Sequence, residues 1–351
     1  RNRAVDWLRR HALQARWHAG DVDVDAVADP GADPGERAGN PFDDDLLRLV
    51  FIACHPVLPR ESRVALTLRL LGGLGTAEIA RAFLQPESTV AQRIVRAKRT
   101  LGEAGVPFEA PARSEWPARL DAVLEVLYLV FNEGYSASSG DDPVRPALCD
   151  EALRLGRVLL HLMPDEPEVA GLLALMELQA SRLRARVDAR GATVLLEDQD
   201  RGRWDWLQVE RGLAALAHAD ALGKGDGPYA VQAAIAACHA RVRRAEDTDW
   251  PRIAALYARL EHIAPNPVVS LNRVVAVCRA EGPSAALALL APLRTHPRLQ
   301  GYAALHAVEG DVRARLGERD AARAAFLRAA GLSGNARDRE ALEARAAALE
   351  G

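Results

Sequence analysis

Residues 76–101 read TAEIARAFLQPESTVAQRIVRAKRTL and predict two short helices joined by a tight turn. Thr76 can cap the first helix, and the Leu-Gln-Pro sequence at 84–86 ends it, because proline fits the first turn of a new helix but not a helix interior. The second helix repeats apolar residues at spacings of four, three and four: Val90, Ile94, Ala97 and Leu101. This pattern indicates a helix-turn-helix with one docked face on its second helix.

The other face of the second helix carries polar and cationic side chains. Such a helix suits the major groove of DNA, where arginine pairs with guanine, glutamine pairs with adenine, and further cations contact phosphates. An ordinary solvated surface helix would show similar charges, but the preceding helix and turn favour DNA binding. The candidate DNA-binding residues are Glu87, Ser88, Thr89, Gln92, Arg93, Arg96, Lys98 and Arg99.

Composition predicts an all-α protein. The 351 residues suffice for two or three domains, 49% of them are hydrophobic, and aromatic residues make up only 5%. Alanine and leucine dominate, and both are strong helix formers. The net charge of −3 is close to neutral, so the whole molecule has no general attraction for nucleic acid. The local excess of cations after Pro86 therefore carries the case for DNA.

The cysteine pattern predicts a reducing environment. The four cysteines are far apart and form no CxxC pair, so we expect buried free thiols in a cytoplasmic protein, with no disulfide, metal site or cofactor. No signal peptide and no apolar run of membrane-spanning length is evident, so we expect no membrane contact. The chain opens on arginine rather than methionine, and we expect it to be a piece of a longer protein.

Changes in composition divide the chain. Residues 1–20 predict a basic helix that needs a packing partner, and residues 21–42 are rich in aspartate, proline and glycine and predict an acidic linker. Residues 43–106 predict a compact four-helix unit that ends with the helix-turn-helix. A spacer at 107–114 leads to a long helical region at 115–351. Because this spacer is a short tether, we expect the helical region to pack on the helix-turn-helix unit.

The long C-terminal region predicts helices throughout, at 116–131, 146–162, 167–186, 206–221, 228–245, 250–263, 267–280, 284–295, 301–316, 319–331 and 336–349. Its last pairs match the tetratricopeptide pattern of small residues at a helix crossing with an aromatic in the second helix. The matching residues are Gly310, Gly317, Ala322, Phe326 and Ala329. Such pairs bury their faces only against the next pair, which predicts a stack with a groove that a protein or peptide could occupy.

Polar residues gather in four runs of this region: FNEGYSAS (131–138), EDQDRGRWDW (197–206), DGPYAVQAAIAACHA (226–240) and PNPVVSLN (265–272). The candidate regulatory or partner-binding residues are Asn132, Glu133, Tyr135, Asp198, Asp200, Arg203, Trp204, Asp226, Tyr229, Gln232, His239 and Asn272. Alternatively, six of them are buried groups at helix crossings that hydrogen-bond to one another: Asn132, Glu133, Asp198, Arg203, Gln232 and His239. No catalytic motif, nucleophile or metal set is present, so we expect no enzyme.

The chain resembles an extracytoplasmic-function sigma factor of RNA polymerase, in the subgroup with a C-terminal tetratricopeptide-like extension. Residues 1–10 are similar to the end of sigma region two, and residues 43–101 resemble region four. The runs associated with the extension are LYLVFNEGYSAS, LMPDEPEVAGLLALMELQASRLRARVDARG, LEDQDRGRWDW, DGPYAVQAAIAACHA and APNPVVSLNR. Most of region two is absent from this sequence.

The resemblance implies promoter-specific transcription initiation together with RNA polymerase core. Residues 87–99 would lie in the major groove of the minus-35 promoter element, and the acidic linker would run toward the RNA exit channel. The extension would modulate sigma activity in place of a membrane-bound anti-sigma factor. Two rivals remain: a helix-turn-helix regulator with a helical sensor domain that acts without core polymerase, and a scaffold whose groove binds a peptide.

Overall fold

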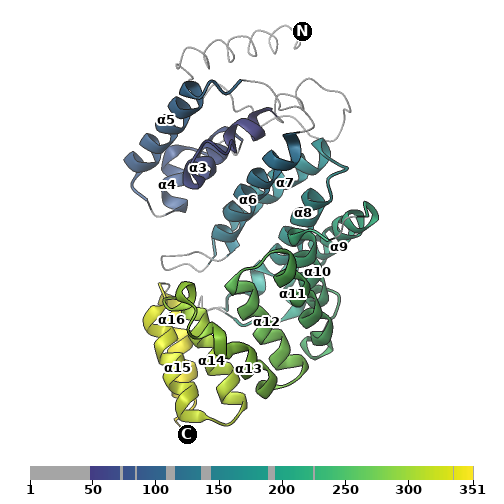
Figure 1. The fold of residues 1–351 in the computed structure, drawn as a ribbon, viewed down its shortest axis with the longest axis vertical. Coiled ribbons are helices and arrows are strands. Elements are labelled where there is room, and N and C mark those ends of the chain that lie inside the picture. Colours follow the sequence, from purple (N-terminus) through teal and green to yellow (C-terminus); the bar gives the residue numbers. More distant parts are fainter. Residues whose placement is uncertain are drawn as a thin grey trace. The chain divides into compact units, whose positions relative to one another are not determined.

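The computed structural model describes residues 48–71, 74–83, 85–107, 115–135, 144–188, 194–223, 226–334 and 336–350. Its described elements are α-helices and short 3₁₀ helices, which confirms the all-α prediction (Figure 1). The predicted basic helix at 1–20 and the acidic linker at 21–42 lie outside the described residues. The described chain forms two compact units.

The first compact unit contains the helix-turn-helix. Its described residues run from 48 to 131 and from 150 to 162. After a helical segment at 48–53 come α3 (Arg60–Leu70), α4 (Thr76–Ala82), α5 (Glu87–Glu103), most of α6 (Trp116–Tyr135) and most of α7 (Pro146–Leu162). Its largest fully buried side chains include Phe51, Leu66, Leu68, Ile79 and Leu101. Every described element up to α5 therefore contributes to one core.

Helices α6 and α7 pack on α3 and on the helical segment before it. Val123 and Leu127 of α6 and Leu155 and Leu159 of α7 line a small apolar cavity together with Val50, Cys54, Thr67 and Leu71. At the edge of this contact, Glu125 of α6 pairs with Arg60 at 3.2 Å and with Arg63 at 3.3 Å. Arg154 of α7 donates to the carbonyl oxygen of Leu71. The expectation that the C-terminal region packs on the four-helix unit is thus confirmed for α6 and α7.

The second compact unit covers residues 132–149 and those after 162. Its helices are α8 (Pro167–Ala180), α9 (Trp206–Ala221), α10 (Pro228–Ala240), α11 (Trp250–Ile263), α12 (Pro267–Ala280), α13 (Pro283–Leu293), α14 (Ala303–Arg315), α15 (Arg319–Leu332) and α16 (Ala336–Ala347). Four of them begin with proline, whose missing N–H has no partner at a helix start anyway. Successive helices pack side by side, among them α11 with α12 and α14 with α15 (Figure 1).

Most predicted helix bounds agree with the structure. The helix predicted at 116–131 extends further, to Tyr135, and two others end early for a physical reason. The predicted 167–186 helix ends at Ala180, and a separate 3₁₀ turn follows at Leu183–Ala185. The predicted 228–245 helix ends at Ala240, where Arg201 donates to the carbonyl oxygens of His239 and Val242. Because a side chain satisfies these last carbonyls, the helix can stop one turn early.

The crossing of α14 and α15 is as close as its small residues predict. A Cβ atom on Gly310 would lie 2.6 Å from Cε1 of Phe326, so only glycine fits at this contact. Ala322 and Ala329 are fully buried beside it. Gly317 ends the turn after α14 with a φ of 81°, a conformation that favours glycine. The small residues therefore set the distance between this pair of helices.

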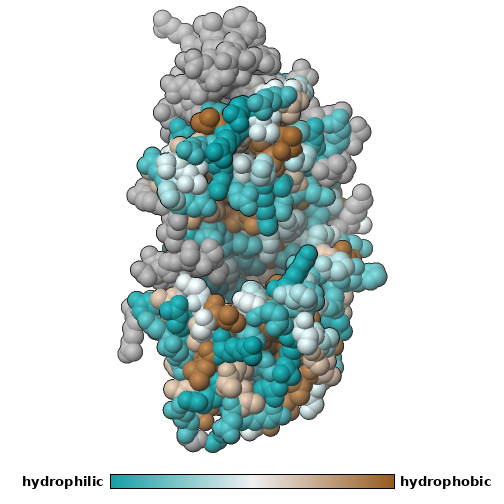
Figure 2. Space-filling view, turned by 60° about the vertical axis from the view of Figure 1, so that its left-hand side comes forward, coloured by the Kyte–Doolittle hydropathy of each residue, from teal (hydrophilic) through white to brown (hydrophobic). Residues whose placement is uncertain are grey.

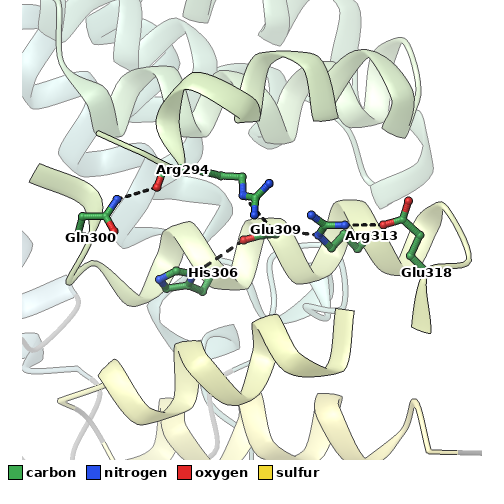
Figure 3. Close-up of polar contacts among 6 residues, drawn as sticks. All are labelled: Arg294, Gln300, His306, Glu309, Arg313 and Glu318. Carbon is green, nitrogen blue, oxygen red and sulfur yellow. Dashed lines mark hydrogen bonds and ion pairs between the residues drawn. The ribbon is translucent and has the colours of Figure 1, made fainter. Parts of the chain in front are cut away.

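A polar network fixes the end of α13 to α14 (Figure 3). The buried carboxylate of Glu309 accepts a hydrogen bond from Arg313 Nε at 2.9 Å and lies 3.2 Å from Arg294 Nε. Arg313 also donates to Glu318 at 2.6 Å, and Gln300 donates to the carbonyl oxygen of Arg294 at 2.6 Å. With two guanidinium partners, the Glu309 charge is compensated inside the helical stack.

The surface of the described residues is largely hydrophilic on the face that Figure 2 shows, with scattered apolar side chains. Within the described ranges no helix is both long enough and apolar enough to cross a bilayer.

Candidate nucleic-acid interface

Helix α4 and the turn that follows it position the start of α5. The backbone N–H of Gly75 donates to Oε2 of Glu78 at 2.6 Å, so Thr76 is the first helical residue and not the cap that the sequence predicted. After α4, the N–H of Gln85 donates to the carbonyl oxygen of Ala80 at 2.9 Å and closes the turn. Pro86 then precedes α5 in an extended conformation, with φ −58° and ψ 138°.

The docked face of α5 is the predicted one. Its buried residues are Val90, Ile94, Ala97 and Leu101. Of the candidate DNA-binding residues, six are exposed (Glu87, Ser88, Thr89, Gln92, Arg96 and Arg99) and two are half-buried (Arg93 and Lys98). An α-helix is about 10–12 Å across and the major groove is about 12 Å wide, so the exposed face can enter it.

Two of the arginines have partners within the unit. Arg93 Nη1 donates to Oε1 of Gln85 at 2.7 Å, so this side chain crosses back to the turn. Arg99 pairs with Glu103 at 3.5 Å, but both side chains are about 70% exposed, and such a surface pair is weak. Arg96 is exposed on the same face as Arg99, and its guanidinium can therefore reach outward.

Val95 is a residue of this face that the sequence analysis did not single out. It is 65% exposed, although it is apolar. It lies three residues after Gln92, one before Arg96 and four before Arg99, so the four side chains form one stripe along the helix. That spacing could have identified it. We call Gln92, Val95, Arg96 and Arg99 the exposed stripe of α5.

The polar candidates of the second unit fall into separate places, and three of them lie in one arginine–aromatic cluster. We define this cluster as Tyr135, Arg182, Arg186, Arg201, Trp204 and His239. The guanidinium carbons of Arg186 and Arg182 lie 3.9 Å and 5.4 Å from the centre of the Tyr135 ring. That of Arg201 lies 4.8 Å from the Trp204 ring. Burial, together with the charges of Arg182 and Arg201, lowers the pKa of His239 to about 3.

The other candidates make local contacts. Glu133 pairs with Arg145, Asp226 pairs with Arg259, and Asp200 accepts from the N–H of Gly202 at 2.8 Å. Gln232 donates to the carbonyl oxygen of Pro228 at 3.0 Å. Tyr229 contributes its N–H, which Glu168 accepts at 2.9 Å. Asn132 is half-buried and Asn272 is exposed. These contacts fix helix ends and turns.

The single buried network predicted for six of these residues is wrong for Asp198 and Arg203. Both are exposed, and Arg203 reaches the carbonyl oxygen of Val187 at 3.4 Å. Asp198 lies in a turn and Arg203 in the 3₁₀ turn at Arg201–Arg203, both before α9 and not at a helix crossing. The sequence analysis also missed Arg182, Arg186 and Arg201 as members of a site. The sequence signal that pointed to these arginines was the repeated arginine in the run that follows α8.

The cysteines play no part in either site. All four are free and buried, as predicted, and burial raises the pKa of Cys54 to about 12. A thiol with so high a pKa stays protonated and unreactive. Among the described residues no group of three or more histidine, cysteine or acidic side chains is placed to hold a metal ion.

Comparison with known families identifies the helix-turn-helix. Residues 48–101 match the family model for sigma-70, region 4, and this range contains α3 and α4 and nearly all of α5. Residues 119–220 match a family of unknown function, DUF6596, and they include Tyr135, Arg182, Arg186, Arg201 and Trp204 of the cluster.

A curated relative is similar over most of the chain. It is the uncharacterized protein R00370 of Rhizobium meliloti (strain 1021), which is 47% identical over 337 residues, or 96% of this chain and 79% of the relative. No solved structure matches. With a sigma-70 region 4 in its helix-turn-helix unit, the chain is a sigma-70 family protein, and it belongs to the same family as R00370.

Proposed function

We propose that this chain acts as a sigma factor that directs RNA polymerase core to specific promoters, with α5 reading the minus-35 element. The exposed stripe of α5 carries the proposal. The face opposite to it is fully docked, and the stripe presents a glutamine, a valine and two arginines at helical spacing in a sigma-70 region 4. These are the side chains that read adenine, the thymine methyl group and guanine.

The start of α5 supports phosphate contacts beside the base contacts. Pro86 offers no side-chain cap, so the first backbone N–H groups of α5 receive no hydrogen bond from the preceding side chain. A helix N-terminus attracts anions through its free N–H groups and its dipole, and Ser88 and Thr89 add exposed hydroxyl donors there. Glu87 can accept from a cytosine amino group. In the proposed complex Lys98 and Arg93 contact the backbone from the sides of the helix.

In this proposal the remaining regions serve the same task. Residues 43–106 are region four, residues 1–20 are the end of region two, and residues 21–42 are a linker that runs toward the RNA exit channel. Residues 115–351 form a tetratricopeptide-like domain, after the spacer at 107–114, that modulates the activity of an extracytoplasmic-function sigma factor in the cytoplasm. The packing of α6 and α7 on α3 supports this modulation, because it gives the DUF6596 region a direct contact with region four.

The test is selection of DNA from a random library by the chain, with and without RNA polymerase core. We expect a specific sequence to be enriched only when core is present. Arg96→Ala should then reduce affinity for that sequence by about 1–3 kcal/mol. Arg298→Ala, which changes an exposed arginine of the second unit, is the matched control and should have no effect.

Two outcomes would contradict the proposal. Tight and specific binding without core would identify a regulator that acts alone, usually as a dimer on a palindrome. Equal DNA affinity of the Arg96→Ala and Arg298→Ala variants would show that α5 is not the reading helix, as expected for a scaffold.

A further inference from the structure

We propose that the arginine–aromatic cluster of the second compact unit is a binding site for the phosphate group of a small molecule. The cluster draws its residues from four places far apart in the sequence: the end of α6, the turn after α8, the segment before α9, and the end of α10. It is independent of the DNA-reading face of α5, which belongs to the other unit.

The first argument is an excess of positive charge. Arg182 and Arg186 both stack on Tyr135, so two guanidinium groups share one ring. Burial and the neighbouring Arg186 lower the pKa of Arg182, and the other groups that affect it are Tyr135 and Tyr257, not carboxylates. Arg201 is also influenced by Arg182, and its acidic neighbours are Glu246 and Asp247 at the exposed turn before α11. Buried like charges are costly unless an anion compensates them.

The second argument is a set of unused donors. Arg201 is 6% exposed and Trp204 is 4% exposed. Nε of Arg201, Nε1 of Trp204 and Nε of Arg186 are all buried, and none of them donates to an acceptor in the described part of the chain. Buried donors are nearly always paired in folded proteins, and three such donors in one cluster call for an oxygen-rich acceptor.

The third argument is that Arg201 is held in place. Nη1 of Arg201 donates to the carbonyl oxygens of His239 and Val242, and its own carbonyl oxygen accepts from Trp206 Nε1 at 3.2 Å. The guanidinium therefore keeps its orientation, and its Nε–H has no acceptor in the described part of the chain. Cation–π stacking alone would explain one arginine on each ring. It does not explain a second guanidinium on Tyr135 or the unused N–H groups.

The chemistry favours phosphate over a carboxylate. Three guanidinium groups carry three positive charges, and His239 adds none because its pKa of about 3 leaves it neutral at physiological pH. A phosphate dianion matches this charge better than a monoanion, and arginine forks bind its oxygens with charge-assisted hydrogen bonds. Because Arg201 and Trp204 are buried, the ligand must be small, whereas the half-buried Arg182, Arg186 and His239 leave a way in from solvent.

The experiment is calorimetric titration of the whole chain with inorganic phosphate and with ribose 5-phosphate, at constant ionic strength. Ribose and sodium chloride serve as the phosphate-free probes. We expect both phosphates, but neither control, to bind and to raise the unfolding temperature. Tighter binding of ribose 5-phosphate would identify an organic phosphate as the ligand, and equal binding would identify free phosphate.

Matched variants place the binding at the cluster. Arg186→Gln should weaken binding about tenfold or more, the usual effect of losing a charge-assisted hydrogen bond. Arg211→Gln, at an exposed position on α9, should change the affinity less than twofold. If Arg186→Gln unfolds the chain, Arg186→Lys keeps the charge without the fork and should still weaken binding severalfold.

The proposal is overturned if neither phosphate binds, if chloride stabilises the chain as much as phosphate does, or if Arg186→Gln and Arg211→Gln bind alike. Binding of an acidic peptide, such as oligoglutamate, in preference to both phosphates would also overturn it and would point to a protein partner.

Discussion

Arg93 Nη1 donates to Oε1 of Gln85 across 2.7 Å and so joins α5 to the turn before it. Arg93→Ala should destabilise the first unit by about 1 kcal/mol, because this hydrogen bond is charge-assisted but only partly buried. Arg96→Ala, three residues on and exposed, should change stability by less than about 0.5 kcal/mol. Urea unfolding of both variants measures the difference, and equal midpoints would show that the Gln85 contact does not stabilise the turn.

Val95 should contact a thymine methyl group in the bound DNA. It is 65% exposed between Gln92 and Arg96, and an apolar side chain there gains binding free energy only by contact with an apolar group. Replacing one thymine of the selected site by uracil, which lacks the methyl group, should cost about 0.8 kcal/mol of affinity. The same replacement should cost the Val95→Ser variant nothing. Equal losses for both proteins at every thymine would exclude the contact.

Acid should destabilise the chain through His239. Its pKa in the folded protein is about 3, below the ordinary histidine value of 6.5, so the unfolded state binds the proton more readily. The stability due to neutral His239 is therefore complete above about pH 6.5 and is lost as the pH falls toward 3. Between pH 6.5 and pH 5 we expect a loss of about 1–2 kcal/mol.

Comparison with His239→Gln isolates this effect, since burial also lowers the pKa values of His55 and His306. The variant should lose less stability than the parent over the same pH range. Parallel stability curves for parent and variant would mean that His239 is not the group that titrates.

Gly310 and Gly331 provide a matched pair in the hairpin of α14 and α15. Gly310→Ala would place a methyl group 2.6 Å from Cε1 of Phe326 and should cost about 1–3 kcal/mol as α14 and α15 move apart. Gly331→Ala meets no atom within 4 Å and should stabilise α15 by about 0.5–1 kcal/mol through helix propensity. Thermal unfolding should therefore shift in opposite directions, and a shift in the same direction would contradict the close crossing.

Local patterns predicted the helices and the docked face of α5 well. Val90, Ile94, Ala97 and Leu101 are set by periodicity alone, and the proline starts of several helices are visible in the sequence. The end of α10 could not be predicted, because the side chain that caps it, Arg201, lies 38 residues from His239 in the chain.

Only half of the arginine–aromatic cluster could be predicted from the sequence, because its residues are far apart in the chain. Tyr135, Trp204 and His239 stood out as polar or aromatic residues in unusual runs. Arg182, Arg186 and Arg201 looked like ordinary surface arginines in a chain with 45 basic residues. Only the packing of α8 and α10 brings them to one place, and sequence periodicity does not predict such a tertiary contact.

The shared core of region four and the α6–α7 pair also bears on how this family can change. Leu71 lines the same cavity as Val123 and Leu155, so a substitution at one of these positions alters the space available to the others. We therefore expect such positions to vary together among homologues. In a sigma protein that lacks this helix pair, the same surface of region four would be exposed to solvent and would not complement α6 and α7. A chimaera that exchanges region four should therefore exchange α6 and α7 together with it.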